Sequence, residues 1–145
     1  MTDPSIRHLT AADEQDRREF AHYTRLDVAR GDFGFAAEQN GTAIGAGWAV
    51  FLPAEDAGYG FVDMQTPELS LWIHAKARGH GLGRHLLRLL KSEARHRGIP
   101  GLSLSVESGN FAHQLYEDEG FRHVRGREAD GVRFWASDEA RAEPT

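Results

Sequence analysis

The chain has 145 residues, 40% of them hydrophobic and 27% charged, which is typical of one globular domain and argues against a disordered or fibrous protein. Its formal net charge of -5 at pH 7 argues against a nucleic-acid partner, because such binding depends on Lys and Arg meeting phosphates. The absence of cysteine excludes disulfides, thiolate catalysis and the commonest zinc and iron–sulfur ligands. No apolar run approaches the roughly 20 residues of a membrane span and no secretory signal is evident, so we expect a cytoplasmic protein.

The first half of the chain is predicted to form a strand, a helical segment and a hairpin. Ser5 to Thr10 is expected to be the first strand, and Ala11 to about Arg30 one or two helices. Phe33 to Glu38 and Thr42 to Leu52 are apolar runs on either side of Asn40-Gly41. An Asn-Gly pair between two such runs is the strongest short-range signal for a β-hairpin.

The middle of the chain predicts two parallel strands joined by a long helix. Leu69 to Ile73 and Leu102 to Val106 have the composition of strands, and the helix between them begins near Leu82 and ends at Gly98. The apolar residues of the helix at helical spacing are Leu82, Leu86, Leu89, Leu90 and Ala94. Because a helix joins the two strands, we expect them to run parallel.

The last third predicts a short helix and a closing pair of strands. The helix, Phe111 to about Glu119, would begin after Asn110, a residue that commonly caps helices. Phe121 to Val124 and Val132 to Ala136 are expected to form an antiparallel pair, and residues 137–145 a frayed tail. The order of elements predicts an α/β protein with a mixed sheet and helices on its faces.

A glycine-rich loop lies between the first of the two parallel strands and the long helix. Its sequence is Arg78-Gly79-His80-Gly81-Leu82-Gly83-Arg84. The first turn of a helix has N–H groups without helical partners and a partial positive charge, and glycine lets a ligand approach the main chain. The loop therefore suits an anion such as phosphate, although a tight turn between strand and helix would also use glycine. It fits neither the dinucleotide-binding pattern, because Arg84 replaces the third glycine, nor the P-loop, because no Gly-Lys-Ser/Thr is present.

Two spaced motifs carry a resemblance to a known family. Arg78, Gly81 and Gly83 form R-x-x-G-x-G. The second motif, N-x-A-x3-Y-x3-G-F, consists of Asn110, Ala112, Tyr116, Gly120 and Phe121. With the strands and helix around them, they resemble the acyl-CoA-binding region of the GNAT superfamily of N-acetyltransferases, and in particular its bacterial small-substrate branch.

The resemblance implies a GNAT acyl-CoA N-acyltransferase fold as a single domain over residues 1–145. Its central mixed β-sheet would be splayed between strands 4 and 5, with helices on both faces. The pantetheine arm of acetyl-CoA would lie in that opening, and its pyrophosphate would rest on main-chain N–H groups of the glycine loop. The implied acetyl-CoA contacts are Trp72, Ile73, Arg78, Gly79, His80, Gly81, Leu82, Gly83, Arg84, Asn110, Ala112 and Tyr116.

The resemblance also implies a reaction, the transfer of an acetyl group from acetyl-CoA to a primary amine by direct attack in a ternary complex. Tyr116 corresponds to the general acid at the thioester sulfur, and an ordinary phenol pKa of about 10 would keep it protonated at neutral pH. Glu68 is the expected base, with Asp63, Glu107 and water as alternatives. A second hypothesis is a non-catalytic sensor or regulatory module that binds acyl-CoA without turnover.

The sequence leaves the acceptor amine open between a small molecule, a peptide N-terminus and a protein lysine. We expect no metal, because there is no cysteine and His80 and His85, five residues apart, lack the spacing of a zinc pair. We also expect no nucleic-acid or membrane partner. An exposed edge strand near the C-terminus would allow a homodimer.

Overall fold

A computed structural model describes residues 4–15, 26–52, 55, 60–105 and 112–137. The chain divides into two compact units. The first unit consists of Met1–Val50 and Ser70–Leu90, and the second of Phe51–Leu69 and Lys91–Thr145. The expectation of a single domain over residues 1–145 stays a prediction.

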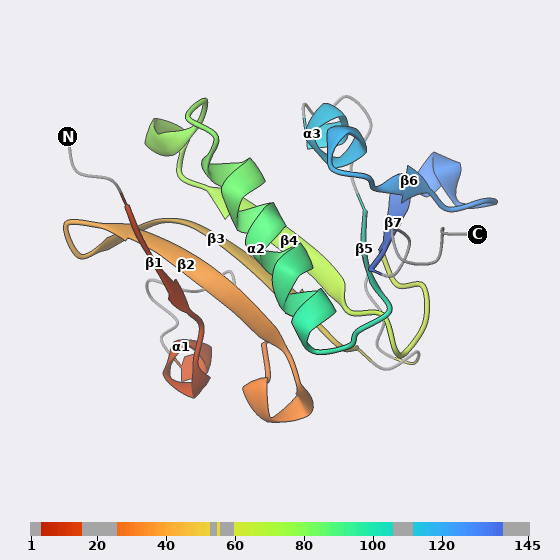
Figure 1. Ribbon diagram of the computed structural model, residues 1–145, viewed down its shortest axis with the longest axis horizontal. Coiled ribbons are helices and arrows are strands. Elements are labelled where there is room, and N and C mark those ends of the chain that lie inside the picture. The colour runs from red at the N-terminus through yellow and green to blue at the C-terminus, as the bar shows by residue number, and fades with distance from the viewer. Residues whose placement is uncertain (1–3, 16–25, 53–54, 56–59, 106–111, 138–145) are drawn as a thin grey trace. The chain divides into compact units, whose positions relative to one another are not determined.

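Seven strands form one mixed sheet in the order β1-β2-β3-β4-β5-β7-β6. The strands, labelled in Figure 1 with the chain coloured from red to blue, are β1 Ser5–His8, β2 Phe33–Gln39, β3 Thr42–Val50, β4 Glu68–Ile73, β5 Gly101–Ser105, β6 Arg122–His123 and β7 Val132–Ala136. β4 pairs with β5 in parallel, whereas β1 with β2, β2 with β3, β5 with β7 and β6 with β7 are antiparallel. The predicted mixed α/β sheet is therefore confirmed.

Three α-helices and several single turns connect the described strands. The helices are α1 Ala11–Gln15, α2 Leu82–His96 and α3 Ala112–Asp118. The predicted helical segment from Ala11 to Arg30 is described as α1 and a 3-10 turn at Val28–Arg30, while residues 16–25 lie outside the described residues. The predicted long helix is confirmed as α2, and the start of the predicted short helix, Asn110 and Phe111, also lies outside.

The hairpin of β2 and β3 in the first unit forms where the Asn-Gly pair predicts it. Asn40 has φ 55° and Gly41 has φ 79°. Positive φ at both central residues is what a type I′ turn requires, and this turn matches the twist of the two strands. A side chain on Gly47 of β3 would place Cβ 3.0 Å from Leu90 Cδ1 and 3.6 Å from Leu86 Cβ, so glycine lets α2 pack closely on this strand.

The parallel pair in the second unit is short. Its register joins Glu68 to Ser103, and Ser103 N donates to Pro67 O at 3.1 Å. β5 pairs with β7 over five register pairs, from Gly101 with Ala136 to Ser105 with Val132. A splay of β4 from β5 beyond Glu68 stays a prediction.

Main-chain hydrogen bonds terminate α2 and hold the residue that follows β7. Gly98 has φ 73° and donates to Arg95 O at 3.1 Å, and Ile99 N donates to Ala94 O at 2.9 Å, as at a helix that glycine terminates. Ser137, which the sequence assigned to a frayed tail, is buried, and its N donates to Pro100 O at 2.8 Å. The predicted frayed tail therefore does not include Ser137, and residues 138–145 lie outside the described residues.

In the described ranges, no helix combines the length and the apolar character that crossing a membrane requires.

Candidate functional site

The glycine loop joins β4 to α2 in the first unit. Gly79 has φ 83° and Gly81 has φ 82°. A Cβ at either position would meet no other described atom within 4 Å, so backbone conformation and not packing requires glycine there. Gly83 lies inside α2, where its φ is not positive, and the turn by itself does not require it.

Hydrogen bonds fix the approach to the loop. His74 N donates to Ile44 O at 2.8 Å, and His74 Nδ1 accepts from Lys76 N at 3.1 Å, which caps the turn Ala75–Ala77. Arg78 is exposed, and its Nε donates to Ile73 O at 3.3 Å. Arg78, one of the implied acetyl-CoA contacts, thus donates to the main chain at the end of β4.

The first helical hydrogen bond of α2 runs from His85 N to Gly81 O at 3.0 Å. The N–H groups of Leu82 and Gly83 therefore precede the hydrogen-bonded ladder of the helix, at the end where its dipole carries partial positive charge. This is the arrangement with which a helix binds an anion.

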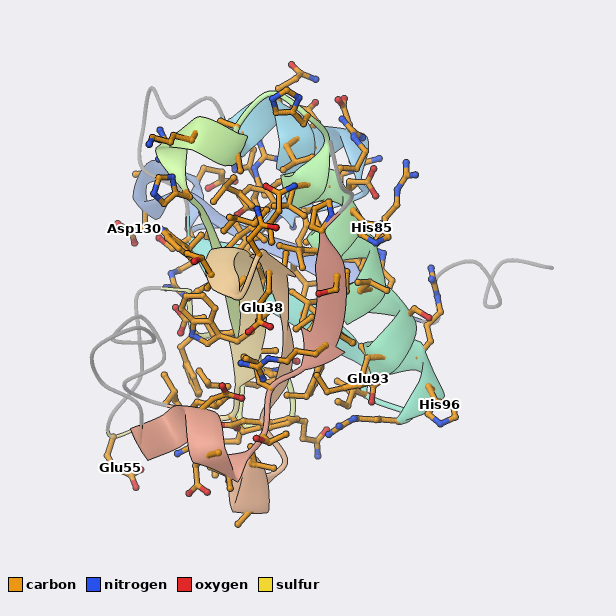
Figure 2. The ribbon with its side chains drawn as sticks, turned by 90° about the vertical axis from the view of Figure 1, so that its left-hand side faces the viewer. Glu38, Glu55, His85, Glu93, His96 and Asp130 are labelled. Atoms are coloured by element: carbon orange, nitrogen blue, oxygen red, sulfur yellow. The ribbon has the colours of Figure 1, made fainter. Side chains whose placement is uncertain are left out.

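A cavity of about 860 Å³ opens at this end of α2, entirely within the first unit. Lys76 and three histidines contribute to it, and its described lining contains no carboxylate. One of them, His85, lies in the first turn of α2 (Figure 2). The lining residues are Pro4, Ile6, Gln39, Asn40, Thr42, Ile44, His74, Lys76, Ala77, His80, Gly81, Leu82 and His85.

The structure brings together only part of the predicted site. The residues of the first unit are Trp72, Ile73, Arg78, Gly79, His80, Gly81, Leu82, Gly83 and Arg84, and those of the second unit are Glu68, Ala112 and Tyr116. Asn110 and the alternative base Glu107 lie outside the described residues.

Sequence reasoning missed Lys76 and His85 as lining residues, although both lie within two residues of the glycine loop. It also missed the tip of the β2–β3 hairpin, from Gln39 to Ile44. The sequence predicts the hairpin itself but does not indicate that its tip lines the cavity. In the described part of the chain no three His, Asp or Glu residues gather as a metal site needs.

Tyr116 lies on α3 and is 7% exposed. Its ring centroid is 5.8 Å from that of Phe121 in an edge-to-face arrangement. Burial raises the pKa of Tyr116 to about 12, above the ordinary phenol value that the sequence analysis assumed. The phenol is therefore protonated at neutral pH, as expected, but it is a weaker acid than expected.

The raised pKa of Tyr116 predicts a loss of stability in strong alkali. The folded protein holds the phenolic proton up to about pH 12 and the unfolded chain only to about pH 10, so the stabilisation is complete below pH 10 and is lost as pH rises to 12. We expect the free energy of unfolding at pH 11.5 to be about 2 kcal/mol lower than below pH 10 because of Tyr116. Denaturant unfolding of the wild type and of Tyr116→Phe at pH 9 and 11.5 measures it. If the free energies of unfolding of the wild type and of Tyr116→Phe differ by the same amount at pH 9 and at pH 11.5, the prediction is wrong.

Glu68, the expected base, is the first residue of β4 and is half-buried. Its Oε2 accepts from Gly60 N at 2.9 Å, while Oε1 is buried without a hydrogen-bond partner among the described residues. A Cβ on Gly60 would lie 2.7 Å from Leu104 C, so Glu68 holds a segment that must pass close to β5. Asp63 is exposed, and its Oδ1 accepts from Gln65 N at 2.9 Å.

The sequence profile of the acetyltransferase (GNAT) family matches residues 4–121 of this chain. A search of curated protein sequences found no match. Among solved structures, the chain is similar to a GNAT-family acetyltransferase from Staphylococcus aureus Mu50, with a TM-score of 0.69 and 13% identity over 92% of this chain and 99% of that chain.

Two further solved structures share the fold. YncA from Salmonella typhimurium, solved with its cofactor acetyl-CoA, has a TM-score of 0.67 and 23% identity over 95% of this chain and 96% of its own. The ribosomal-protein-alanine N-acetyltransferase from Brucella melitensis has a TM-score of 0.65 and 25% identity over 90% of this chain and 96% of its own.

Proposed function

This chain belongs to the acetyltransferase (GNAT) family, and on that premise we propose that it transfers an acetyl group from acetyl-CoA to a primary amine. The observation that carries the proposal is the cavity at the amino end of α2. Lys76, three imidazoles and the leading N–H groups of a helix meet there without a carboxylate in the described lining, in a chain whose net charge is -5. An anionic ligand gains from each of these groups.

We propose that the pyrophosphate of acetyl-CoA binds the main-chain N–H groups of Gly79 to Arg84. Hydrogen bonds to charged groups contribute about 1.5–3 kcal/mol each, so a few of them supply much of the affinity. His80 would add a side-chain donor, and Trp72 and Ile73 would adjoin the pantetheine arm. Asn110 and Ala112 complete the proposed contacts.

In the proposed reaction the amine nitrogen attacks the acetyl carbonyl, the C–N bond forms, and the C–S bond breaks to leave a thiolate. With the pKa of Tyr116 at about 12 and that of an ordinary thiol near 8.5, full proton transfer from the phenol to sulfur is unfavourable by about 5 kcal/mol. We therefore assign Tyr116 a hydrogen bond to the departing sulfur, which stabilises the developing charge. The proton that the amine loses completes the free thiol.

Glu68 is proposed to accept the proton of the amine. Its buried, unbonded Oε1 is a stronger candidate than the exposed carboxylate of Asp63. Because Oε2 is bonded to Gly60 N, Glu68 combines this proposed role with a structural one. Glu107 and water remain the alternatives.

Acetyl-CoA binding and turnover test the proposal directly. We expect saturable binding of acetyl-CoA in titration calorimetry, and thiol release with at least one amine from a panel of polyamines, lysine peptides and a peptide with N-terminal alanine. The peptide with N-terminal alanine is included because the similar Brucella melitensis protein is named a ribosomal-protein-alanine N-acetyltransferase. No binding would overturn the proposal, whereas binding without release for every amine would favour the non-catalytic sensor.

Replacing Lys76 measures how much its positive charge contributes to the affinity for acetyl-CoA. We expect Lys76→Gln to weaken acetyl-CoA binding about threefold, because the lost cation is exposed and screened by solvent. Arg97→Gln is the matched control, since Arg97, just beyond the end of α2, pairs with Glu93 at 2.7 Å and lies outside the cavity lining. Equal affinities for wild type and Lys76→Gln in titration calorimetry would show that Lys76 takes no part.

Two expectations from the sequence remain proposals, a cytoplasmic location and a homodimer. β6 is the last strand at one edge of the sheet, and an edge strand can pair with a second copy.

A further inference from the structure

Two cations hold the carboxyl end of α3, the helix that carries Tyr116. Lys91 Nζ donates to Glu119 O at 2.7 Å and to Glu119 Oε1 at 3.0 Å, and the two side chains are 12% and 4% exposed. Arg122 Nη1 donates to Glu117 O, in the last turn of α3, at 3.2 Å. The last carbonyls of a helix lack helical partners and carry partial negative charge, so cations there satisfy and stabilise them.

A series of aromatic rings leads from Tyr116 to the same lysine. The ring of Tyr116 lies 5.8 Å from that of Phe121, which lies 6.3 Å from that of Trp135. Lys91 Nζ lies 5.5 Å from the centroid of the Trp135 ring, a distance typical of a cation–π contact. Lys91 therefore contacts both the main chain at the end of α3 and the last ring in the series.

α3 depends on such contacts for its position. It has seven residues, and isolated helices shorter than about 12–15 residues are marginal in water. Gly120, with φ 93°, ends it, and Phe121 N donates back to Tyr116 O at 2.9 Å. A shift of the Glu119 carbonyl would therefore be transmitted within one turn to the residue that bears the phenol.

We propose that Lys91 is a positioning residue for the reaction, which fixes the carboxyl end of α3 and so holds the Tyr116 phenol in its productive direction. This inference rests on the proposed function of Tyr116. A merely structural lysine would contribute equally whether or not a phenol is present at position 116, whereas a positioning lysine acts through that phenol.

A double-mutant cycle separates the two roles. We expect Lys91→Met to lower kcat about tenfold with KM for acetyl-CoA unchanged, and to have no further effect on kcat in the Tyr116→Phe background. Lys91→Arg, which keeps a cation and donors, should recover most of kcat. Arg97→Met, just beyond the end of α2, is the matched control, because it removes the cation that pairs with Glu93 of that helix, and it should leave kcat unchanged.

The outcomes distinguish this inference from the function on which it rests. If Lys91→Met lowers kcat by the same factor in both backgrounds, the inference is overturned while the transferase activity stands. A wild type that releases no thiol with any amine overturns both. If Lys91→Met fails to fold because it removes the cation beside the buried carboxylate of Glu119, Lys91→Met combined with Glu119→Gln removes that negative charge and gives the same two tests.

Discussion

Tyr116→Phe is expected to lower kcat for amine acetylation about 100-fold and to leave KM for acetyl-CoA within about twofold of the wild type. The expected loss is at the low end of the range for a positioned proton donor, because we propose that the buried phenol donates a hydrogen bond to sulfur without transferring its proton completely. Phe keeps the ring and its contact with Phe121, so the fold is preserved at neutral pH. Initial rates of thiol release at saturating amine measure the effect.

The acidity of the leaving thiol gives the control for Tyr116. An acetyl thioester of a more acidic thiol needs less stabilisation as the C–S bond breaks, so the difference in kcat between wild type and Tyr116→Phe should shrink with such a donor. A difference that stays the same for both thioesters would assign Tyr116 a role other than stabilising the departing sulfur. Equal kcat values with acetyl-CoA itself would remove Tyr116 from the reaction.

The sequence predicted the elements whose causes are local. Asn40-Gly41 requires a turn with two positive φ values, and the structure has them. Of the residues predicted at helical spacing in α2, Leu86, Leu90 and Ala94 are fully buried, whereas Leu89 is half-buried and Leu87, which was not among them, is fully buried. Gly98 ends that helix because its left-handed φ of 73° is accessible to glycine at little cost. Each of these signals lies within a few residues of the element that it specifies.

The sequence could not predict the features that depend on distant segments. The acidity of Tyr116 follows from burial, and the second role of Glu68 follows from Gly60, which approaches β5. Ser137 N donates to Pro100 O, far away in the chain, so the assignment of this one residue to a frayed tail was wrong. The proposed role of Lys91 likewise depends on Glu119, a partner that helical periodicity does not indicate.

Gly81→Ala is expected to weaken acetyl-CoA binding about 30-fold, which corresponds to about 2 kcal/mol. The new Cβ meets no described protein atom within 4 Å, so its cost inside the protein is the strain of φ 82° and not a clash. It would, however, stand beside the main-chain N–H groups that we propose to bind the pyrophosphate, and one hydrogen bond to a charged group is worth about 1.5–3 kcal/mol. Titration calorimetry with acetyl-CoA measures the change.

Gly126→Ala is the matched control, because Gly126 has φ 83° and a Cβ there also meets no described atom within 4 Å. Strain alone should lower the thermal midpoints of the two variants by similar amounts, since the left-handed conformation costs a residue with a Cβ about 1–2 kcal/mol. Only Gly81→Ala should also lose affinity for acetyl-CoA. If both variants keep the wild-type affinity, the glycine loop is only a turn between β4 and α2, and the pyrophosphate binds elsewhere.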